Sequence, residues 1–396
     1  MEIQVTRQEL EARIKKLCKA NSEKYPEWDS AIILNRISQY YFTGTMQEGL
    51  LLIKKDGAMM YFARRSYERA LEESPLDCIY PMETYRDAAQ VAGRKLGNTL
   101  VETEVLTVGI LERLKKHFDI KQLFNIENIV FGIRAVKSPY ELYWMSLAGK
   151  RHQIVMEEII PGILREGISE VEFTAELFEK LLKMGYHGVS RFYKYQTEII
   201  VGQVGFGENS LYPTNFDGPG GMKGLCPAVP LFGCRERLLK KGDLVFVDFG
   251  FGLYGYHSDK TQVYMFGAKP SEEVAKVHRK CMELQQKLAG MLRPGAIPSD
   301  IYNSVMGELD ADFLYNFMGF GNRRAKFLGH GLGLYIDEHP VIANGFNTPL
   351  EENMTIALEP KKGIAGVGMV GTEDTYIVTP EGGRCITGGE REIIVV

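Results

Sequence analysis

The sequence contains no run of about 20 apolar residues, which is the length that a membrane-spanning helix needs. Its start, MEIQVTRQELEARIKKL, is charged throughout and has neither the apolar core nor the small-residue cleavage site of a signal peptide. Concentrated positive charge is missing as well. Lys and Arg number 47 against 51 Asp and Glu, and no basic stripe could follow a phosphate backbone. We therefore expect a cytoplasmic protein with neither a membrane nor a nucleic acid as its partner.

The sequence also lacks paired cysteines. None of the six stands in a CxxC pair or near a histidine at zinc-finger spacing. They are Cys18, Cys78, Cys226, Cys234, Cys281 and Cys385. We expect reduced thiols, as in a reducing compartment. A disulfide or a reactive thiol at Cys226 and Cys234 stays open as an alternative, because both lie in one loop rich in Gly and Pro.

A chain of 396 residues, 45% of them hydrophobic, is long enough to form two or three domains, each with its own core. The clearest boundary is 138-SPYE-141. Ser138 can cap a helix, Pro139 suits the first helical position, and Glu141 completes a capping box. The predicted domains are therefore residues 1–137 and 138–396.

Alternating strands and helices in the first part predict an α/β unit. Two apolar runs between Asp29 and Phe62 are joined by KKDGA, a typical hairpin turn. We expect helices over 66–73, 87–96 and 105–117. In the second part we expect helices over 171–184 and after Ser271, and strands over 243–250, 260–267, 353–360 and 374–379. Residues 201–230 are crowded with Gly and Pro, which favours a long functional loop.

Four carboxylates stand in or beside strands that are otherwise apolar. Asp248 lies inside 243-DLVFVDFG-250, Glu359 ends one apolar strand, Glu373 precedes another, and Asp259 begins a third. A carboxylate is seldom buried without a partner, so these four residues require a cation. Each one alone is more typical of a turn or a salt bridge.

His330 has glycine on both sides in 327-FLGHGLGLYIDEHP-340, so few neighbouring side chains can enclose it. Four carboxylates and one imidazole suit a pair of divalent ions of Mn, Fe, Co or Zn, because four negative charges balance four positive ones. Such a pair lowers the pKa of a bound water and polarises a carbonyl oxygen. The pattern therefore predicts a hydrolytic site.

The order and spacing of these five residues, within DFGFGLYGYHSDKT, GHGLG, LEP and TED, resemble the metal-binding set of the M24 metallopeptidase family. The segment 40-YYFTGTMQEGLLLIKKDG-57 and the join RAVKSPYEL resemble the creatinase, prolidase and aminopeptidase P branch, so the likeness covers the whole chain. It implies an α+β protein with a creatinase-like α/β domain followed by a pita-bread catalytic domain, a curved antiparallel sheet backed by helices. It also implies a homodimer.

The resemblance assigns a role to each of the five residues. Asp248 would be a terminal ligand, Asp259 and Glu373 bridging ligands, and His330 and Glu359 terminal ligands on opposite metals. Glu359 would also shuttle a proton from the bridging water. Thr261 matches a threonine that supports the ligands in the family, whereas Gln262 stands where these peptidases commonly carry arginine.

Two histidines that hold the substrate in this branch are missing. Their positions fall on Leu231 and Asp337, and neither residue can donate a hydrogen bond to an oxyanion. His339 and His257 are candidates to replace them as substrate-binding residues. The insertion 208–226 has no counterpart in the ordinary prolidase pattern, and we expect it to cover the active site.

Three functions follow as hypotheses. The first is a dinuclear metallohydrolase similar to Xaa-Pro dipeptidases and aminopeptidases, acting on a short peptide or amide. The second is a lyase or creatinase-like C–N hydrolase acting on a small zwitterion, with Asp337 as the general base or the group that binds the amine. The third is a non-catalytic binding protein on the same fold. Five retained ligand types argue against the third hypothesis, because a protein that only binds a partner has no need to bury four carboxylates.

Overall fold

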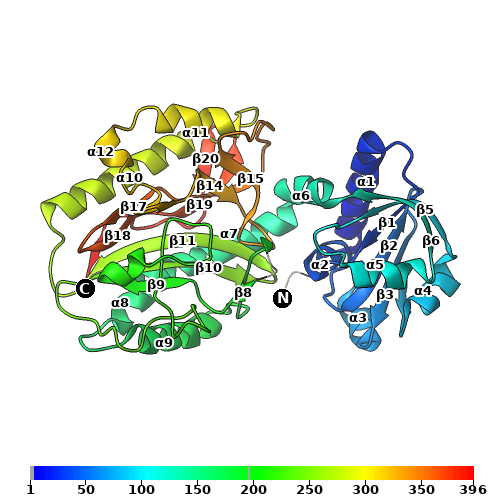
Figure 1. Cartoon of the computed structure of the whole chain (residues 1–396), viewed down its shortest axis with the longest axis horizontal. Helices are drawn as coiled ribbons and strands as arrows, with labels where there is room; N and C mark the ends of the chain where they lie inside the picture. The colour runs from blue at the N-terminus through cyan, green and yellow to red at the C-terminus, as the bar shows by residue number, and fades with distance from the viewer. Residues whose placement is uncertain (1–3, 195–196) are drawn as a thin grey trace. The chain divides into compact units, whose positions relative to one another are not determined.

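The structure is a computed structural model that describes residues 4–194 and 197–396 (Figure 1). It divides into two compact units, Met1–Arg134 and Ala135–Val396. The predicted boundary, between residues 137 and 138, lies close to this division. Mixed helices and strands in both units agree with the predicted α+β class.

The first unit is built on one mixed sheet of order β4-β3-β2-β1-β5-β6. Its strands are β1 (Ser30–Ile33), β2 (Glu48–Lys54), β3 (Met59–Arg64), β4 (Ile79–Pro81), β5 (Lys95–Val101) and β6 (Asp119–Asn125). Strands β2 and β3 form the predicted hairpin, in which the amide of Gly57 donates to the carbonyl of Lys54. The core on this sheet includes Ile32, Leu50, Leu52 and Phe62.

Six helices accompany this sheet. They are α1 (Arg7–Lys24), α2 (Arg36–Thr43), α3 (Tyr67–Glu73), α4 (Tyr85–Ala92), α5 (Val108–Lys115) and α6 (Glu127–Ala135). The prediction of a helix up to residue 96 was wrong at its end. Gly93, with φ of 82°, ends α4, and the chain then enters β5.

Two antiparallel-based sheets form the second unit. The first has the order β21-β11-β10-β9, and the second has the order β15-β14-β16-β19-β20. The first sheet contains β9 (Gln203–Phe206), β10 (Leu244–Leu253), β11 (Tyr256–Met265) and β21 (Ile394–Val395). The second contains β14 (Phe327–Gly331), β15 (Glu338–Ala343), β16 (Thr355–Leu358), β19 (Asp374–Thr379) and β20 (Gly382–Cys385).

Three two-stranded sheets complete the strands of this unit. They are β7 (Ser190–Arg191) with β8 (Glu198–Ile199), β12 (Gly319–Phe320) with β13 (Arg323–Arg324), and β17 (Lys361–Ile364) with β18 (Gly368–Gly371). The hairpin of β10 and β11 differs from its prediction, because both strands continue to a turn at Tyr254 and Gly255. Asp259 therefore lies in the middle of a strand rather than at its start.

Helices cover both sides of these sheets (Figure 1). Helix α7 packs on β10 and β11, whereas α10 packs on β16, β17, β18 and β20. The helical segments of this unit are α7 (Pro139–Ile154), a π-helical turn (Val155–Ile159), α8 (Ile160–Ile163), α9 (Glu170–Lys183), a 3-10 turn (Gly207–Leu211), α10 (Glu272–Met291), α11 (Pro298–Met306) and α12 (Ala311–Leu314). The core between α10 and the second sheet includes Leu284, Leu288, Leu328, Ile356 and Leu358.

Local sequence explains where the main helices begin. Ser138 and Glu141 form the predicted capping box of α7, with Pro139 at the first helical position. Ser271 caps α10 as predicted, because its hydroxyl accepts from the amide of Val274. These caps fix the two helices that pack against the sheets carrying the candidate site.

Two expectations from composition can be compared with the structure. Among the residues that the structure describes, no helix has the length and apolar character needed to cross a membrane. All six cysteines are free, and Cys234 Sγ lies 3.0 Å from a carboxylate oxygen of Glu236. Cys226 and Cys234 therefore form no disulfide in this structure.

A buried ion pair joins the two sheets of the second unit. Lys260 Nζ lies 2.8 Å from Asp374 Oδ1, and both side chains are fully buried. Removing the charge of Asp374 leaves the ammonium of Lys260 buried, with the carbonyl of Gly388 as its hydrogen-bond acceptor. We expect Asp374→Ala to lower the free energy of unfolding of this unit by about 3–5 kcal/mol.

Urea unfolding followed by Trp144 fluorescence in a Trp28→Phe background measures this loss, because Trp144 lies in the second unit and Trp28 in the first. The matched control is Glu176→Ala, which removes the exposed pair of Glu176 with Arg165. It should cost less than about 1 kcal/mol. Equal losses in the two variants would contradict the expectation.

Candidate metal centre

The five residues predicted as metal ligands converge on one place between the two sheets of the second unit. Asp248 lies on β10 and Asp259 on β11, whereas His330 lies on β14. Glu359 follows β16 directly, and Glu373 stands directly before β19. A bridge between Thr261 and Glu373 connects the two sheets at this point. Residues 125 positions apart in the chain are thus brought within contact distance.

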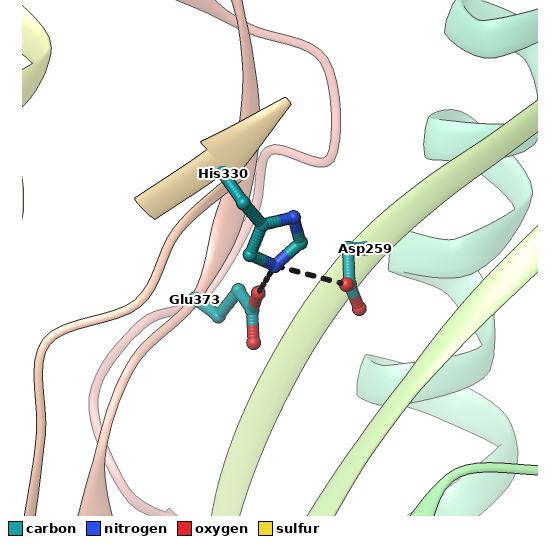
Figure 2. A group of neighbouring side chains, drawn as sticks. All are labelled: Asp259, His330 and Glu373. Carbon is teal, nitrogen blue, oxygen red and sulfur yellow. Dashed lines mark ion pairs between the residues drawn. The ribbon is translucent and has the colours of Figure 1, made fainter. Parts of the chain in front are cut away.

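His330 stands among three of the four carboxylates. Its Nε2 atom lies 3.4 Å from Glu359 Oε1, 3.8 Å from Glu373 Oε1 and 3.9 Å from Asp259 Oδ2. Figure 2 shows the imidazole pointing between Asp259 and Glu373. Nδ1 lies 3.1 Å from the carbonyl of Gly331, so a proton on Nδ1 leaves Nε2 free to coordinate an ion.

Lys361 lies on the other side of the same carboxylates. Its Nζ atom is 2.6 Å from Glu373 Oε2, 2.8 Å from Glu359 Oε2 and 3.0 Å from Asp248 Oδ2. The side chain is fully buried. The three protons of the ammonium match three carboxylate oxygens, so every donor of this lysine has a partner.

Glu359 and Glu373 each use both carboxylate oxygens. In each residue Oε1 faces His330 and Oε2 faces Lys361. Glu373 Oε2 also accepts a hydrogen bond of 2.9 Å from the hydroxyl of Thr261, the residue predicted to support the ligands. The two glutamates therefore connect the imidazole with the ammonium.

Burial and like charges shift the acid strengths of the site. Burial, opposed by the charge of Lys361 and supported by that of Glu373, raises the pKa of Asp248 to about 6. Burial, together with Glu373 and Asp248, also raises the pKa of Asp259 well above its ordinary value. Crowded carboxylates hold protons in this way when too little positive charge lies between them.

For the two basic groups of the site, burial and the neighbouring charges act on the pKa in opposite directions. Burial alone would lower the pKa of His330, but its hydrogen bond to Glu359 and the charges of Glu359, Asp259 and Glu373 raise it to about 10. Burial likewise opposes the charge of Lys361, but Asp248, Glu359 and Glu373 raise its pKa well above the ordinary value. Lys361 is therefore an ammonium at neutral pH.

Asp259, His330 and Glu373 fit a divalent ion. Each offers one ligand atom, and the three atoms lie within 4.8 Å of one another. Carboxylate oxygen and imidazole nitrogen are donors that Mn, Fe, Co and Zn all accept. The oxygens of Asp248, Glu359 and Glu373 that face Lys361 are a different case, because an ammonium already lies between them.

Asp337 is half-buried near His330, whose charge acts on it. The Oδ1 atom of Asp337 accepts a 2.9 Å hydrogen bond from the amide of Tyr193. Loss of contact with water raises the pKa of Asp337 to about 6, although this hydrogen bond opposes the shift. The position assigned to Asp337 from the sequence thus carries a half-buried carboxylate that the chain itself bonds at one oxygen.

His257 and His339 differ from Asp337 in their surroundings. His257 is fully buried, with Nδ1 3.0 Å from the carbonyl of Gly333 and Nε2 3.2 Å from His187 Nε2. His339 is exposed at the surface and stands beside the ring of Phe346. The hydrogen bonds of His257 favour a structural role, and substrate binding by either histidine stays a prediction.

Leu231 packs among apolar side chains, with Ile199, Phe216 and Met222 in one cluster. Phe216 and Met222 belong to the insertion 208–226, so the insertion packs around Leu231, where the resemblance predicts a substrate-binding histidine. Gly220, also in the insertion, packs so closely on Phe246 that an added Cβ would lie 2.8 Å from its ring. That ring lies 5.8 Å from Lys361 Nζ, which places the insertion one side chain away from the ammonium.

A pocket of about 230 Å³ opens along the insertion. Its lining includes Leu211, Pro213, Pro219, Phe320 and Arg323. Arg323 donates to the carbonyl of Phe216, which ties the insertion to strand β13. The insertion therefore shapes a cavity, and its expected position over the active site stays a prediction.

The sequence analysis did not identify Lys361. The signal was present, since a lysine opens the segment between Glu359 and Glu373 and both glutamates were expected to be buried. In the sequence, however, Lys361 and Lys362 are adjacent, and nothing indicates which of them faces the site. The structure shows the difference: Lys361 faces the carboxylates, whereas Lys362 Nζ donates to main-chain carbonyls such as that of Phe313.

Comparisons of sequence agree with this geometry. A model of the metallopeptidase family M24 matches residues 144–380, and a model of the creatinase/prolidase N-terminal domain matches residues 13–136. An Xaa-Pro dipeptidase of Pyrococcus horikoshii is 28% identical over 372 residues, which cover 92% of this chain and 94% of that protein. An Xaa-Pro dipeptidase of Pyrococcus furiosus is 27% identical, covering 97% of this chain and 100% of that protein.

Comparisons of structure agree on the fold. The Xaa-Pro dipeptidase from Bacillus anthracis superposes with a TM-score of 0.80 at 24% identity, covering 98% of this chain and 100% of that chain. The X-Pro aminopeptidase from Thermotoga maritima MSB8 superposes with a TM-score of 0.77 at 22% identity, covering 97% and 99%. Both likenesses extend over the two units.

The buried pair of His187 and His257 predicts how stability depends on pH. Burial lowers the pKa of His257 to about 4 and that of His187 to about 2. An unfolded histidine takes up a proton near pH 6.5, so between about pH 6.5 and 4 the unfolded state binds protons that the folded state does not. Stability contributed by these neutral rings is therefore present above pH 6.5 and falls as the pH decreases.

We expect His257→Asn to reduce the slope of unfolding free energy against pH between 6 and 5 by up to about 1.4 kcal/mol per pH unit. Urea unfolding at pH 8, 6 and 5 measures this slope. At pH 8 the ring is neutral in both states, so the loss seen there reports packing alone. An unchanged slope in the variant would contradict the assignment of His257 as a buried neutral ring.

Proposed function

The chain belongs to metallopeptidase family M24, and we propose that it cleaves short peptides of the Xaa-Pro class, or related amides, with a divalent ion held by Asp259, His330 and Glu373. The family makes it a metal-dependent hydrolase with a creatinase-type first domain and a pita-bread catalytic domain, as the sequence predicted. A non-catalytic binding protein is therefore set aside. The observation that carries the proposal is the convergence of five ligand residues from separate strands on one point.

A divalent ion bound at this site would lower the pKa of a water and polarise a carbonyl oxygen. Manganese, cobalt, zinc and iron all suit the donors, and availability decides among them. The site does not offer free ligand atoms to both ions of the expected pair. His330, Asp259 and Glu373 offer free ligand atoms, whereas the oxygens on the opposite side are engaged by Lys361.

We assign the proton transfer to Glu359. One of its oxygens faces His330 and the other accepts from Lys361, so the carboxylate is fixed at the centre of the site. From there it can take a proton from the attacking water and deliver it to the leaving amine. The ammonium of Lys361 keeps Glu359 oriented without occupying the oxygen that faces His330.

Asp337 is proposed to bind the amino group of the substrate. It is a half-buried carboxylate near His330, and the amide of Tyr193 donates a hydrogen bond to its Oδ1 atom. A carboxylate in this position selects a substrate with a free amino terminus, as an aminopeptidase or dipeptidase requires. His339 and His257 remain weaker candidates for substrate contact, because His339 is exposed and His257 bonds to Gly333 and His187.

Three further features belong to this proposal. Residues 1–137 and 138–396 would act as the two domains of a cytoplasmic enzyme. The functional form would be a homodimer. Neither a nucleic acid nor a membrane would take part. The dipeptidase names of the Pyrococcus relatives support a short substrate.

A non-peptidase reaction is the second candidate. Leu231 packs in an apolar cluster where an oxyanion donor is expected, and Asp337 has a pKa of about 6, which suits a general base. A small zwitterion could then undergo elimination or C–N hydrolysis at this site. Peptide cleavage is favoured because two sequence relatives that match nearly the whole chain are named Xaa-Pro dipeptidases.

The direct test of substrate class uses purified protein supplied separately with Mn, Co, Zn or Fe(II). We expect hydrolysis of Xaa-Pro dipeptides such as Ala-Pro, and slower cleavage of longer peptides with the same first two residues. N-acetylated Ala-Pro serves as the matched control, because it lacks the cationic amine, and it should not be cleaved. Release of free proline is the measurement. Metal-bound protein that cleaves no dipeptide would favour the zwitterion alternative.

The variant Asp337→Asn separates the two roles of this residue. Losing an ion pair with the substrate's amine should raise KM for Ala-Pro about 10-fold or more, while kcat changes little, since about 1.5–3 kcal/mol of charged hydrogen bonding is lost in binding. Steady-state kinetics at pH 7.5 measure both KM and kcat. If instead kcat falls by more than about 100-fold with an unchanged KM, Asp337 is a general base and amine binding is contradicted.

A further inference from the structure

Lys361 stands where the paired-metal hypothesis requires an ion. Its Nζ atom lies 2.6–3.0 Å from one oxygen each of Asp248, Glu359 and Glu373. A divalent ion bound by the same three oxygens would lie about 2.0–2.2 Å from each of them. These two sets of distances differ by less than about 1 Å, so a bound ion would overlap the ammonium. The position can therefore hold only one of the two cations.

We propose that the ammonium of Lys361 permanently replaces one ion of the pair, so that this enzyme binds a single divalent ion beside His330. This inference rests on the proposed function, because it concerns the metal of the same site. The proposed site contains one ion on the side of Asp259 and His330 and one ammonium on the side of Asp248. The two glutamates lie between these cations.

The orientation of the glutamates supports this division. Glu359 and Glu373 each direct Oε1 to the imidazole and Oε2 to the ammonium, as bridging carboxylates would direct their oxygens to two cations. Of these two groups, Asp248 forms an ion pair with the ammonium and Asp259 with the imidazole. The five predicted ligands are thus divided between two positions, of which one has a lysine as its cation.

Lys361 is fixed by strand pairing, and its side chain is fully buried. It is the first residue of β17 and pairs with Gly371 of β18. A Cβ added at Gly371 would lie 2.6 Å from Lys361 Cα and 3.1 Å from its Cγ, so the glycine is what allows the lysine to pass inward. Phe246 lies beyond the ammonium, with its ring centroid 5.8 Å from Nζ. Backbone pairing and packing therefore hold the ammonium at the carboxylates.

The ammonium also changes the charge of the site. Asp248, Asp259, Glu359 and Glu373 bring four negative charges when ionised. One divalent ion with the ammonium leaves a net charge of -1, whereas two divalent ions with the ammonium would leave a net charge of +1. The charge sum alone does not separate these cases, so the inference rests on the position of the ammonium, which leaves no room for a second ion.

Metal content of the wild-type protein tests the proposal without any reference to activity. The protein is stripped with chelator, loaded with excess Mn²⁺, freed of unbound metal by gel filtration and analysed by mass spectrometry of the elements. We expect close to one Mn per chain and a six-line electron paramagnetic resonance spectrum typical of an isolated Mn²⁺. Two Mn per chain with the spectrum of a coupled pair would overturn the inference, and so would a chain that binds none.

Three variants locate the ion. Asp259→Asn should lose it, whereas Asp248→Asn should still bind one, because Asp248 serves the ammonium. Lys361→Gly opens the second position and should bind two ions per chain. The matched control is Lys362→Gly on the same strand, which should bind one. A Lys361→Gly protein that folds and still binds one ion would contradict the role of the lysine.

Should Lys361→Gly fail to fold, the wild-type metal count and the contrast between Asp248→Asn and Asp259→Asn still decide the question. Equal loss of metal in these two variants would overturn the inference. These results are independent of the proposed substrate. A protein with one ion and no dipeptidase activity would contradict the proposed function alone, and an active dipeptidase with two ions would contradict this inference alone.

Discussion

Four carboxylates buried at one point are the constraint on which the catalytic unit depends. Removing a carboxylate from water costs several kcal/mol unless a cation compensates for it. The protein supplies one of these cations itself, the ammonium of Lys361, which contacts three of the carboxylates. The remaining negative charge is what attracts a metal ion. Folding and metal binding in this unit are therefore two parts of the same electrostatic problem.

The fold solves this problem by bringing distant segments together. Strands β10 and β11 place two aspartates on one sheet, and the neighbourhood of β14, β16 and β19 adds one histidine and two glutamates from the other. The short hairpin of β17 and β18 then directs Lys361 inward between them. Helices α7 and α10 pack against the two sheets and are fixed by serine caps. Local sequence signals thus position a site that no single segment contains.

Much of this could be predicted from the sequence. The five ligand residues were recognisable because each interrupts an apolar strand or stands between glycines, and because their spacing resembles a known family. The capping box at Ser138 was equally clear. Lys361 could not be predicted, because two adjacent lysines differ only in which one the strand turns inward. The length of β10 and β11 was also missed, since glycines and polar residues at 250–259 suggested a longer turn.

The central claim is that one ammonium and one metal ion share these carboxylates. Crystals soaked with Co²⁺ and measured at the cobalt absorption edge test it most directly, because anomalous scattering locates each ion. The account predicts one anomalous peak in contact with His330 Nε2 and Asp259, and ordinary nitrogen density at Lys361 Nζ beside Asp248. A second peak among Asp248, Glu359 and Glu373, with Lys361 displaced, would contradict it.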